Sequence, residues 1–249
     1  MIIRKSPSEI EIMREAGRIS ARALRMVGEA VRPGITTAEL DELAEEAIRE
    51  EGAVPAFLGY MGFPKTLCTS VNEQVVHGIP SKSVRLSEGD ILSVDVGAVI
   101  KGYYGDNART FAVGQVSPET RQLLTTTEEA LMAGVVTCYE GKRLFDIGHA
   151  VQSIAERDGF SVVREYVGHG IGRSMHEDPN VPNYGRKNTG LKLQVGMVLA
   201  IEPMVNAGAS PVEKLPDGWT VVTADGSASA HFEHTVAITE SGPLILTAE

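Results

Sequence analysis

The chain has 249 residues, of which 43% are hydrophobic and 22% charged, a composition typical of globular proteins that excludes a disordered or fibrous one. A net charge of −10 disfavours binding to nucleic-acid backbones. Two cysteines are too few for a disulfide framework and indicate a reducing compartment. Because no signal peptide and no apolar run of ~18 residues is found, we expect a cytoplasmic protein without membrane contact.

Two helices are predicted at the start of the chain. Ser8 and Glu11 have the spacing of a capping box, with Pro7 outside it, and apolar residues then recur at helical spacing as far as residue 27. Thr36 and Glu39 form a second candidate capping box, before a helix that is expected to end near residue 52.

Short β-rich runs separated by glycine and proline follow the helices. Strands are predicted at Ile91–Val99 and Tyr104–Val113. Ser117 and Pro118 indicate the start of a third helix, which is expected to end near residue 139. The remaining predicted elements are a helix at Phe145–Arg157 and strands at Met197–Ile201, Trp219–Thr223 and Phe232–Ile238.

The order of two helices followed by strands therefore occurs twice. Gly89–Asp95 and Gly196–Glu202 also match, since each is a glycine, a hydrophobic strand and a carboxylate at the sixth following position. Coincidence between two buried strands is the alternative, but an apolar strand rarely needs a carboxylate at its end. We expect one domain over residues 1–249 with internal pseudo-symmetry.

Asp95 and Asp106 flank a turn candidate at Lys101-Gly102. A hairpin turning there places the two carboxylates diagonally across neighbouring strands, on one face of the sheet. Burying both is unfavourable without a counter-charge. The alternatives are a capping role for Asp95 and an exposed position in a Gly-Asp turn for Asp106.

Two glutamates also lie in predicted strands. Glu202 follows an apolar strand and precedes Pro203, which cannot continue a sheet ladder, and Glu233 alternates with apolar neighbours. Either could instead form an ion pair, and Arg109 is an available partner.

Three histidines are candidate functional residues. His169 has glycines on both sides, which leave its imidazole accessible and suit it to ligation. His77 and His176 lie in loop-like sequence, where hydrogen bonding within the loop is the alternative. For His176, pairing with Glu177 or Asp178 is a further alternative.

Four carboxylates and one imidazole make an oxygen-rich set of donors. Such a set suits divalent Mn, Fe or Co, with Zn also compatible. A mononuclear site rarely uses four carboxylates, whereas two ions ~3.5–4 Å apart share bridging carboxylates. The combination therefore favours a dinuclear metal site.

Taken together, these runs resemble the type I methionine aminopeptidases, metallohydrolases of the pita-bread fold. The resemblance covers essentially the whole chain and implies an α+β fold with pseudo-symmetric halves, each with two helices packed on a curved, mainly antiparallel sheet. The matching runs are Cys68–Pro80, Asp95, Gly105-Asp106, Gly168–Gly172, Ile201–Met204 and Phe232–Thr235.

The resemblance implies two divalent metal ions (Co, Mn, Fe or Zn). A hydroxide that bridges the two ions would attack the first peptide carbonyl. Glu202 would then carry the proton from the water to the leaving amine, His176 would donate to the developing oxyanion, and His77 would orient the substrate. The implied metal ligands are Asp95, Asp106, His169, Glu202 and Glu233, with Asp106 and Glu233 bridging.

A methionine pocket is implied as well, with Phe57 at its edge, where core packing is favoured. Members of the family often have Phe where Met175 stands and Gln where His231 stands. The implied substrate-binding residues are Tyr60, Phe63, Cys68, His77, Met175, His176 and Trp219. A monovalent cation is implied near Asn72, Val75 and Ser229, where structural hydrogen bonding is the alternative.

By resemblance, the function is removal of the initiator methionine from nascent proteins, with a small second residue preferred. A monomer in transient proximity to ribosomes is expected. By resemblance, neither the extra N-terminal domain of prolidases nor the helical insertion of type II enzymes is expected. The alternatives are a metal-free member of the fold that binds peptides or proteins, and hydrolysis of another small substrate.

Overall fold

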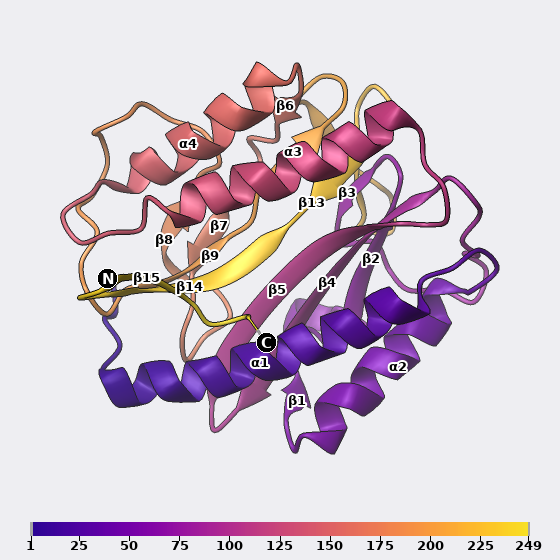
Figure 1. The fold of residues 1–249 in the computed structure, drawn as a ribbon. Helices are drawn as coiled ribbons and strands as arrows, with labels where there is room; N and C mark the ends of the chain where they lie inside the picture. Colours follow the sequence, from indigo (N-terminus) through magenta and orange to yellow (C-terminus); the bar gives the residue numbers. More distant parts are fainter. Residues whose placement is uncertain (1, 249) are drawn as a thin grey trace.

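The computed structural model describes residues 2–248 and contains two pairs of helices on one side of a large sheet (Figure 1). Each half of the chain supplies one pair, as the resemblance implies. The helices are α1 (Pro7–Ala30), α2 (Thr37–Glu50), α3 (Pro118–Val135) and α4 (Leu144–Arg157), with a short 3-10 helix at Tyr60–Gly62.

Helix α1 begins earlier than the sequence spacing predicts. Ser6 caps it, because the Ser6 hydroxyl accepts from the Glu9 backbone N–H and the Glu9 carboxylate accepts from the Ser6 N–H. The predicted box at Ser8 and Glu11 is therefore wrong by two residues, since Pro7 stands at the first helical position, where proline is favoured.

The predicted starts of α2 and α3 are confirmed, and α4 begins at Leu144, one residue before its predicted start. Thr36 and Glu39 form a capping box at α2, and Ser117 caps α3 with Pro118 as its first residue. Helix α3 ends at Val135, four residues before its predicted end, because the chain turns at residues 136–141.

Within residues 2–248, nine strands form the main sheet, in the order β1-β4-β5-β14-β9-β7-β8, with β2 paired to β4 and β15 to β14. Two three-stranded sheets, β13-β10-β6 and β11-β12-β3, complete the fold. The strands of the main sheet are β1 (Val54–Pro55), β2 (Leu67–Val71), β4 (Ile91–Ile100), β5 (Tyr103–Ala112), β7 (Gly168–Gly170), β8 (Glu177–Val181), β9 (Val198–Ile201), β14 (Glu233–Thr239) and β15 (Gly242–Ile245). The others are β3 (Gln74–Val76), β6 (Ser161–Val162), β10 (Met204–Asn206), β11 (Val212–Lys214), β12 (Val221–Thr223) and β13 (Ser229–His231).

The long hairpin β4–β5 confirms the predicted turn. Ile100 pairs with Tyr103, so the loop consists of Lys101 and Gly102 alone. Both have positive φ, 52° and 76°, as a tight two-residue hairpin turn requires. The turn thereby fixes which residues of β4 and β5 face each other.

Each half has its own hydrophobic core beneath its helix pair. In the first half α1 and α2 bury residues such as Leu40 and Ile48 against Leu92 and Val94 of β4. In the second half α3 and α4 pack on β9 and β14 through a separate cluster that includes Leu131 and Ile147. The helices therefore cover one face of the sheet, and the opposite face is left for the site.

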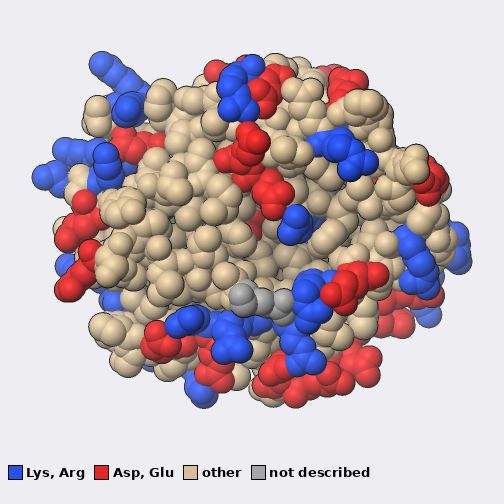
Figure 2. Space-filling model, in the orientation of Figure 1, with Lys and Arg blue, Asp and Glu red and all other residues tan. Residues whose placement is uncertain are grey.

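The face that carries the helices is rich in charge. Figure 2 shows acidic and basic side chains concentrated over α1 and α2 and a smaller charged group between the two helix pairs. Among residues 2–248, no helix combines the length and apolar character that crossing a bilayer requires.

Candidate metal centre and substrate pocket

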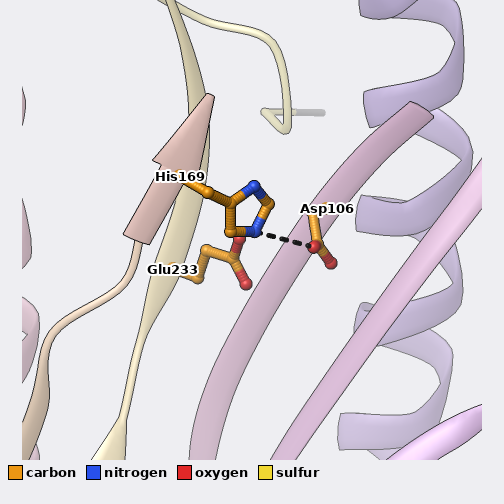
Figure 3. Close-up of side chains that lie close together, drawn as sticks. All are labelled: Asp106, His169 and Glu233. Atoms are coloured by element: carbon orange, nitrogen blue, oxygen red, sulfur yellow. Dashed lines mark ion pairs between the residues drawn. The ribbon is translucent and has the colours of Figure 1, made fainter. Parts of the chain in front are cut away.

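Asp106, His169 and Glu233 converge from three different strands, β5, β7 and β14 (Figure 3). One ligating atom from each lies within 4.8 Å of the others. The Nε2 atom of His169 is 3.9 Å from Asp106 Oδ2 and 3.4 Å from an Oε1 of Glu202, the residue that follows β9. These four side chains therefore surround a common point.

Asp95 joins this group through the β4–β5 register. Asp95 pairs with Ala108 and Asp106 pairs with Gly97, so the two carboxylates are diagonal neighbours, as predicted. Asp106 is 4% exposed, which rules out the alternative of an exposed turn residue. All five predicted ligands line one cavity.

Burial raises the pKa of all four carboxyl groups, that of Asp95 to about 7. In Asp106 and Glu233 the charges of the neighbouring carboxylates raise the pKa further. Asp95 Oδ1 and Glu233 Oε1 are buried without a hydrogen-bond donor. Such a set is unfavourable unless a cation shares the site.

No Lys or Arg of residues 2–248 forms an ion pair with these carboxylates. Arg109, the alternative partner, pairs with Glu128 on the surface at 3.2 Å. The donor set is four carboxylates and an imidazole, and its unpaired oxygens fit divalent metal ions.

The tautomer of His169 suits ligation through Nε2. Its Nδ1–H donates to the Gly170 carbonyl, 2.9 Å away, which leaves the Nε2 lone pair facing the carboxylates. Burial and the neighbouring His176 lower its pKa to about 4, so the ring is neutral near pH 7.

The five candidate metal ligands, called here the metal-type cluster, line a cavity of about 160 Å³ together with an apolar pocket. Phe57 belongs to a buried hydrophobic cluster, as the core-packing interpretation predicts, and it also lines the cavity. Met61, 82% exposed at the mouth, was missed, because nothing in its sequence context distinguishes it. The cavity is lined by every predicted substrate-binding residue: Tyr60, Phe63, Cys68, His77, Met175, His176 and Trp219.

His176 lies between the pocket and the cluster. Its Nδ1 is 2.8 Å from the Tyr60 hydroxyl, and its ring centroid is 4.2 Å from that of His169. Glu177 pairs instead with Lys5, so the alternative pairing of His176 with Glu177 is wrong. The Tyr60–His176 contact spans 116 positions, and no sequence spacing signals it.

His77 also lines the pocket. Its backbone has a positive φ of 61°, and its ring meets Trp219 and Tyr166 edge to face at 6.4 and 5.7 Å. Burial lowers its pKa to about 4, so a neutral imidazole faces the cavity.

His231 and Met175, the two departures from the family pattern, both lie at the site. The Nε2 atom of His231 is buried without a hydrogen-bond partner, 3.7 Å from Glu202 Oε2. Met175 is 2% exposed and packs over Gly97, where an added Cβ would lie 3.3 Å from its Cε atom.

The predicted monovalent-cation residues form hydrogen bonds within the protein. The Asn72 side chain accepts from the Ile91 N–H and donates to Asp90, both at 2.9 Å. The Ser229 hydroxyl donates to Asn206 Oδ1 at 2.8 Å. The cation itself stays a prediction.

Comparisons with known proteins agree with this geometry. Residues 11–240 match the model of metallopeptidase family M24. The chain is 56% identical to a methionine aminopeptidase of Clostridium acetobutylicum over 247 residues, 99% of each chain. The chain also matches the crystal structure of methionine aminopeptidase from Thermotoga maritima over the full length of both chains, with 50% identity and a TM-score of 0.99. The chain therefore belongs to metallopeptidase family M24 and, within it, to the methionine aminopeptidases.

Proposed function

We propose that this protein hydrolyses the first peptide bond of polypeptides that begin with methionine. The observation that carries the proposal is the apolar cavity of about 160 Å³ whose lining also includes the five candidate metal ligands. A thioether packs well against aromatic faces and sulfur, and Phe63, Cys68, Met175 and Trp219 offer both.

Asp95, Asp106, His169, Glu202 and Glu233 are the residues that would hold two divalent ions. Bound divalent ions would supply Lewis acidity, which lowers the pKa of a water and polarises the scissile carbonyl. The unpaired oxygens of Asp95 and Glu233 support this assignment. The choice among Co, Mn, Fe and Zn depends on the availability of each metal in the cell as well as on the donor atoms.

Glu202 is proposed to move the proton of the attacking water to the leaving amine. Its carboxyl group is buried beside the cluster, and burial raises its pKa, which suits a group that must both accept and release a proton.

The two pocket histidines are proposed to act on the substrate itself. When the Tyr60 hydroxyl donates to His176 Nδ1, the proton of the neutral imidazole lies on Nε2, where it can donate to a developing oxyanion. His77, which also lines the cavity, is proposed to hold the substrate backbone.

Several finer features belong to the same proposal. The substrates are nascent chains with a small second residue, which the protein meets near ribosomes in the cytoplasm as a monomer. Residues 1–249 act as one catalytic unit, because both halves contribute ligands to the same cluster. A monovalent cation near Asn72, Val75 and Ser229 completes the prediction.

The test is hydrolysis of Met-Ala-Ser, Met-Lys-Ser and Leu-Ala-Ser peptides, before chelation, after chelation and after metal return. We expect release of methionine from Met-Ala-Ser alone, its loss on chelation and its recovery with Mn²⁺ or Co²⁺. Equal cleavage of all three peptides, or activity that survives complete removal of metal, contradicts the proposal. Peptide binding without any cleavage would instead favour the metal-free binding protein.

A further inference from the structure

The loop between β7 and β8 carries two residues of the proposed site. Met175 closes the apolar pocket and His176 faces the metal-type cluster. The His176 side chain contacts Tyr60 and His169, and neither contact fixes the loop backbone. The position of both side chains therefore depends on what holds residues 171–177.

A buried ion pair connects this loop to the N-terminal segment. Lys5 Nζ lies 2.6 Å from Glu177 Oε2, and the two side chains are only 3% and 8% exposed. Lys5 also donates to the Ile3 carbonyl at 3.1 Å. A lysine is rarely buried unless it is paired, and burying both charges is itself unfavourable. The ion pair therefore contributes little net stability, so stability alone does not explain why it is buried at this place in the fold.

The second oxygen of the Glu177 carboxylate holds the loop. Oε1 accepts from the backbone N–H groups of Arg173 and Ser174, at 2.9 and 3.2 Å. A Cβ at Gly172 would lie 2.4 Å from Lys5 Cε and 2.5 Å from Glu177 Oε1, so glycine makes room for the pair. One carboxylate therefore joins Lys5 to the turn that precedes Met175 and His176.

Neighbouring contacts hold the start of the same loop. The Tyr104 N–H donates to the Gly172 carbonyl at 2.9 Å. The guanidinium of Arg173 lies 4.4 Å from the ring centroid of Tyr103, whose hydroxyl donates to Glu9 in the first turn of α1. The loop is thus fastened at several points to the N-terminal segment and hairpin β4–β5.

We propose that Lys5 and Glu177 are positioning residues for the reaction, because through the loop backbone they set the places of His176 and Met175. The inference rests on the proposed function. Lys5 holds the Glu177 carboxylate in place against the two amides, and those amides fix the turn. A displacement of about 1 Å in such a group is enough to cost about 100-fold in rate.

Two matched double variants test the proposal. Lys5→Met/Glu177→Gln and Lys5→Met/Glu177→Leu both remove the ion pair, but only the first keeps an acceptor for the Arg173 and Ser174 amides. With Mn²⁺ and Met-Ala-Ser, we expect kcat of the Leu form to fall about 100-fold with a smaller change in KM, and the Gln form to stay within about tenfold of wild type. In metal-free protein, amide hydrogen exchange of residues 173 and 174 should be faster in the Leu form.

Lys101→Met is the control, because Lys101 forms an ion pair with Glu15 at the same 2.6 Å but with side chains 60% and 43% exposed. Its kcat should equal that of wild type. A purely structural pair would lower the melting temperature of both double variants and leave their kcat values equal.

A folded Leu form with wild-type kcat, or with unchanged exchange at residues 173 and 174, overturns the inference. If the Leu form does not fold, Lys5→Met alone decides, since an unchanged kcat overturns the inference and a fall of about tenfold supports it. Failure of the wild-type protein to release methionine is a separate result, which contradicts the proposed function instead.

Discussion

The two halves of the sheet begin their central strand pairs in the same way. Gly89 precedes β4 with a φ of 92° and Gly196 precedes β9 with a φ of 90°. The N–H of each glycine donates at 2.9 Å to a backbone carbonyl, that of Val113 directly after β5 in the first half and that of Ile238 in β14 in the second. The strand pairs β4–β5 and β9–β14 are thus structurally equivalent in the two halves, and each brings two carboxylates to the cluster.

The halves differ in how their two strands are joined. A turn of two residues joins β4 to β5, whereas residues 202–232 separate β9 from β14 and contain β10 to β13. This longer segment supplies Trp219 to the pocket and His231 to the neighbourhood of Glu202. The comparison indicates that both halves supply candidate metal ligands and pocket residues, while the groups proposed to move protons come from the second half.

The largest expected effect comes from Glu202→Gln, which tests this division directly. Loss of a group that transfers a proton lowers kcat by about 10²–10⁴-fold. Because the apolar pocket is untouched, peptide binding measured by calorimetry should persist. The first-half variant Asp95→Asn should instead lose metal affinity, so its activity should rise with added Mn²⁺.

Unchanged turnover in Glu202→Gln would remove Glu202 from its proposed role. Equal recovery of both variants at high Mn²⁺ concentration would show that Glu202 and Asp95 act alike, which breaks the comparison between the halves.

Metal removal tests whether both halves depend on the same cations. Ions present at 100 times their Kd stabilise a folded protein by about 2.7 kcal/mol. At about 2–4 °C per kcal/mol for a chain of this size, chelation should lower the melting temperature by roughly 5–10 °C. Asp106→Asn should abolish this metal-dependent shift.

Asp41→Asn is the matched control. Asp41 is a buried carboxylate of the first half, but it accepts from the Thr66 and Leu67 N–H groups, both at 2.9 Å, and lies outside the cluster. It should lower the melting temperature and leave the shift on chelation intact. A shift that persists in Asp106→Asn would place the metal elsewhere.

Local chemistry explains which features the sequence predicts well. The turn at Lys101-Gly102 fixes the register of β4 against β5, so the diagonal placement of Asp95 and Asp106 follows from spacing alone. The capping boxes also depend on a few adjacent residues, and even there Ser6 could be told from Ser8 only by the place of Pro7.

Contacts between distant segments could not be predicted in this way. The convergence of His169 and Glu233 with Asp106 was expected from family resemblance, because nothing local relates three strands of a curved sheet. The hydrogen bond between Tyr60 and His176 and the pair Lys5–Glu177 were not predicted at all. Each joins segments more than 100 positions apart, so it depends on the complete fold.

A smaller effect is expected from Tyr60→Phe. This variant distinguishes the role of Tyr60 as a wall of the pocket in the first half from its hydrogen bond with His176 in the second half. The variant keeps the aromatic ring and removes only the hydroxyl 2.8 Å from His176 Nδ1. A hydrogen bond of this kind contributes about 0.5–1.5 kcal/mol, so kcat should fall roughly 2–13-fold with little change in KM. Tyr184→Phe, outside the pocket lining, should leave kcat unchanged. A rise in KM alone would mean that Tyr60 serves only as pocket wall.

The smallest effect should come from His231→Gln, which tests whether the segment between β9 and β14 contributes to proton transfer through His231. Burial lowers the pKa of His231 to about 3, so the ring is neutral and can offer Glu202 at most a hydrogen bond. A glutamine amide keeps a polar N–H near the Glu202 carboxylate, and we expect kcat within about threefold of wild type, whereas His231→Leu should lose about tenfold because it places an apolar side chain beside that buried carboxylate. Fluorogenic methionine peptides measure both. If His231→Gln fell as far as His231→Leu, the imidazole itself would be needed, and proton transfer in the second half would involve His231 as well as Glu202.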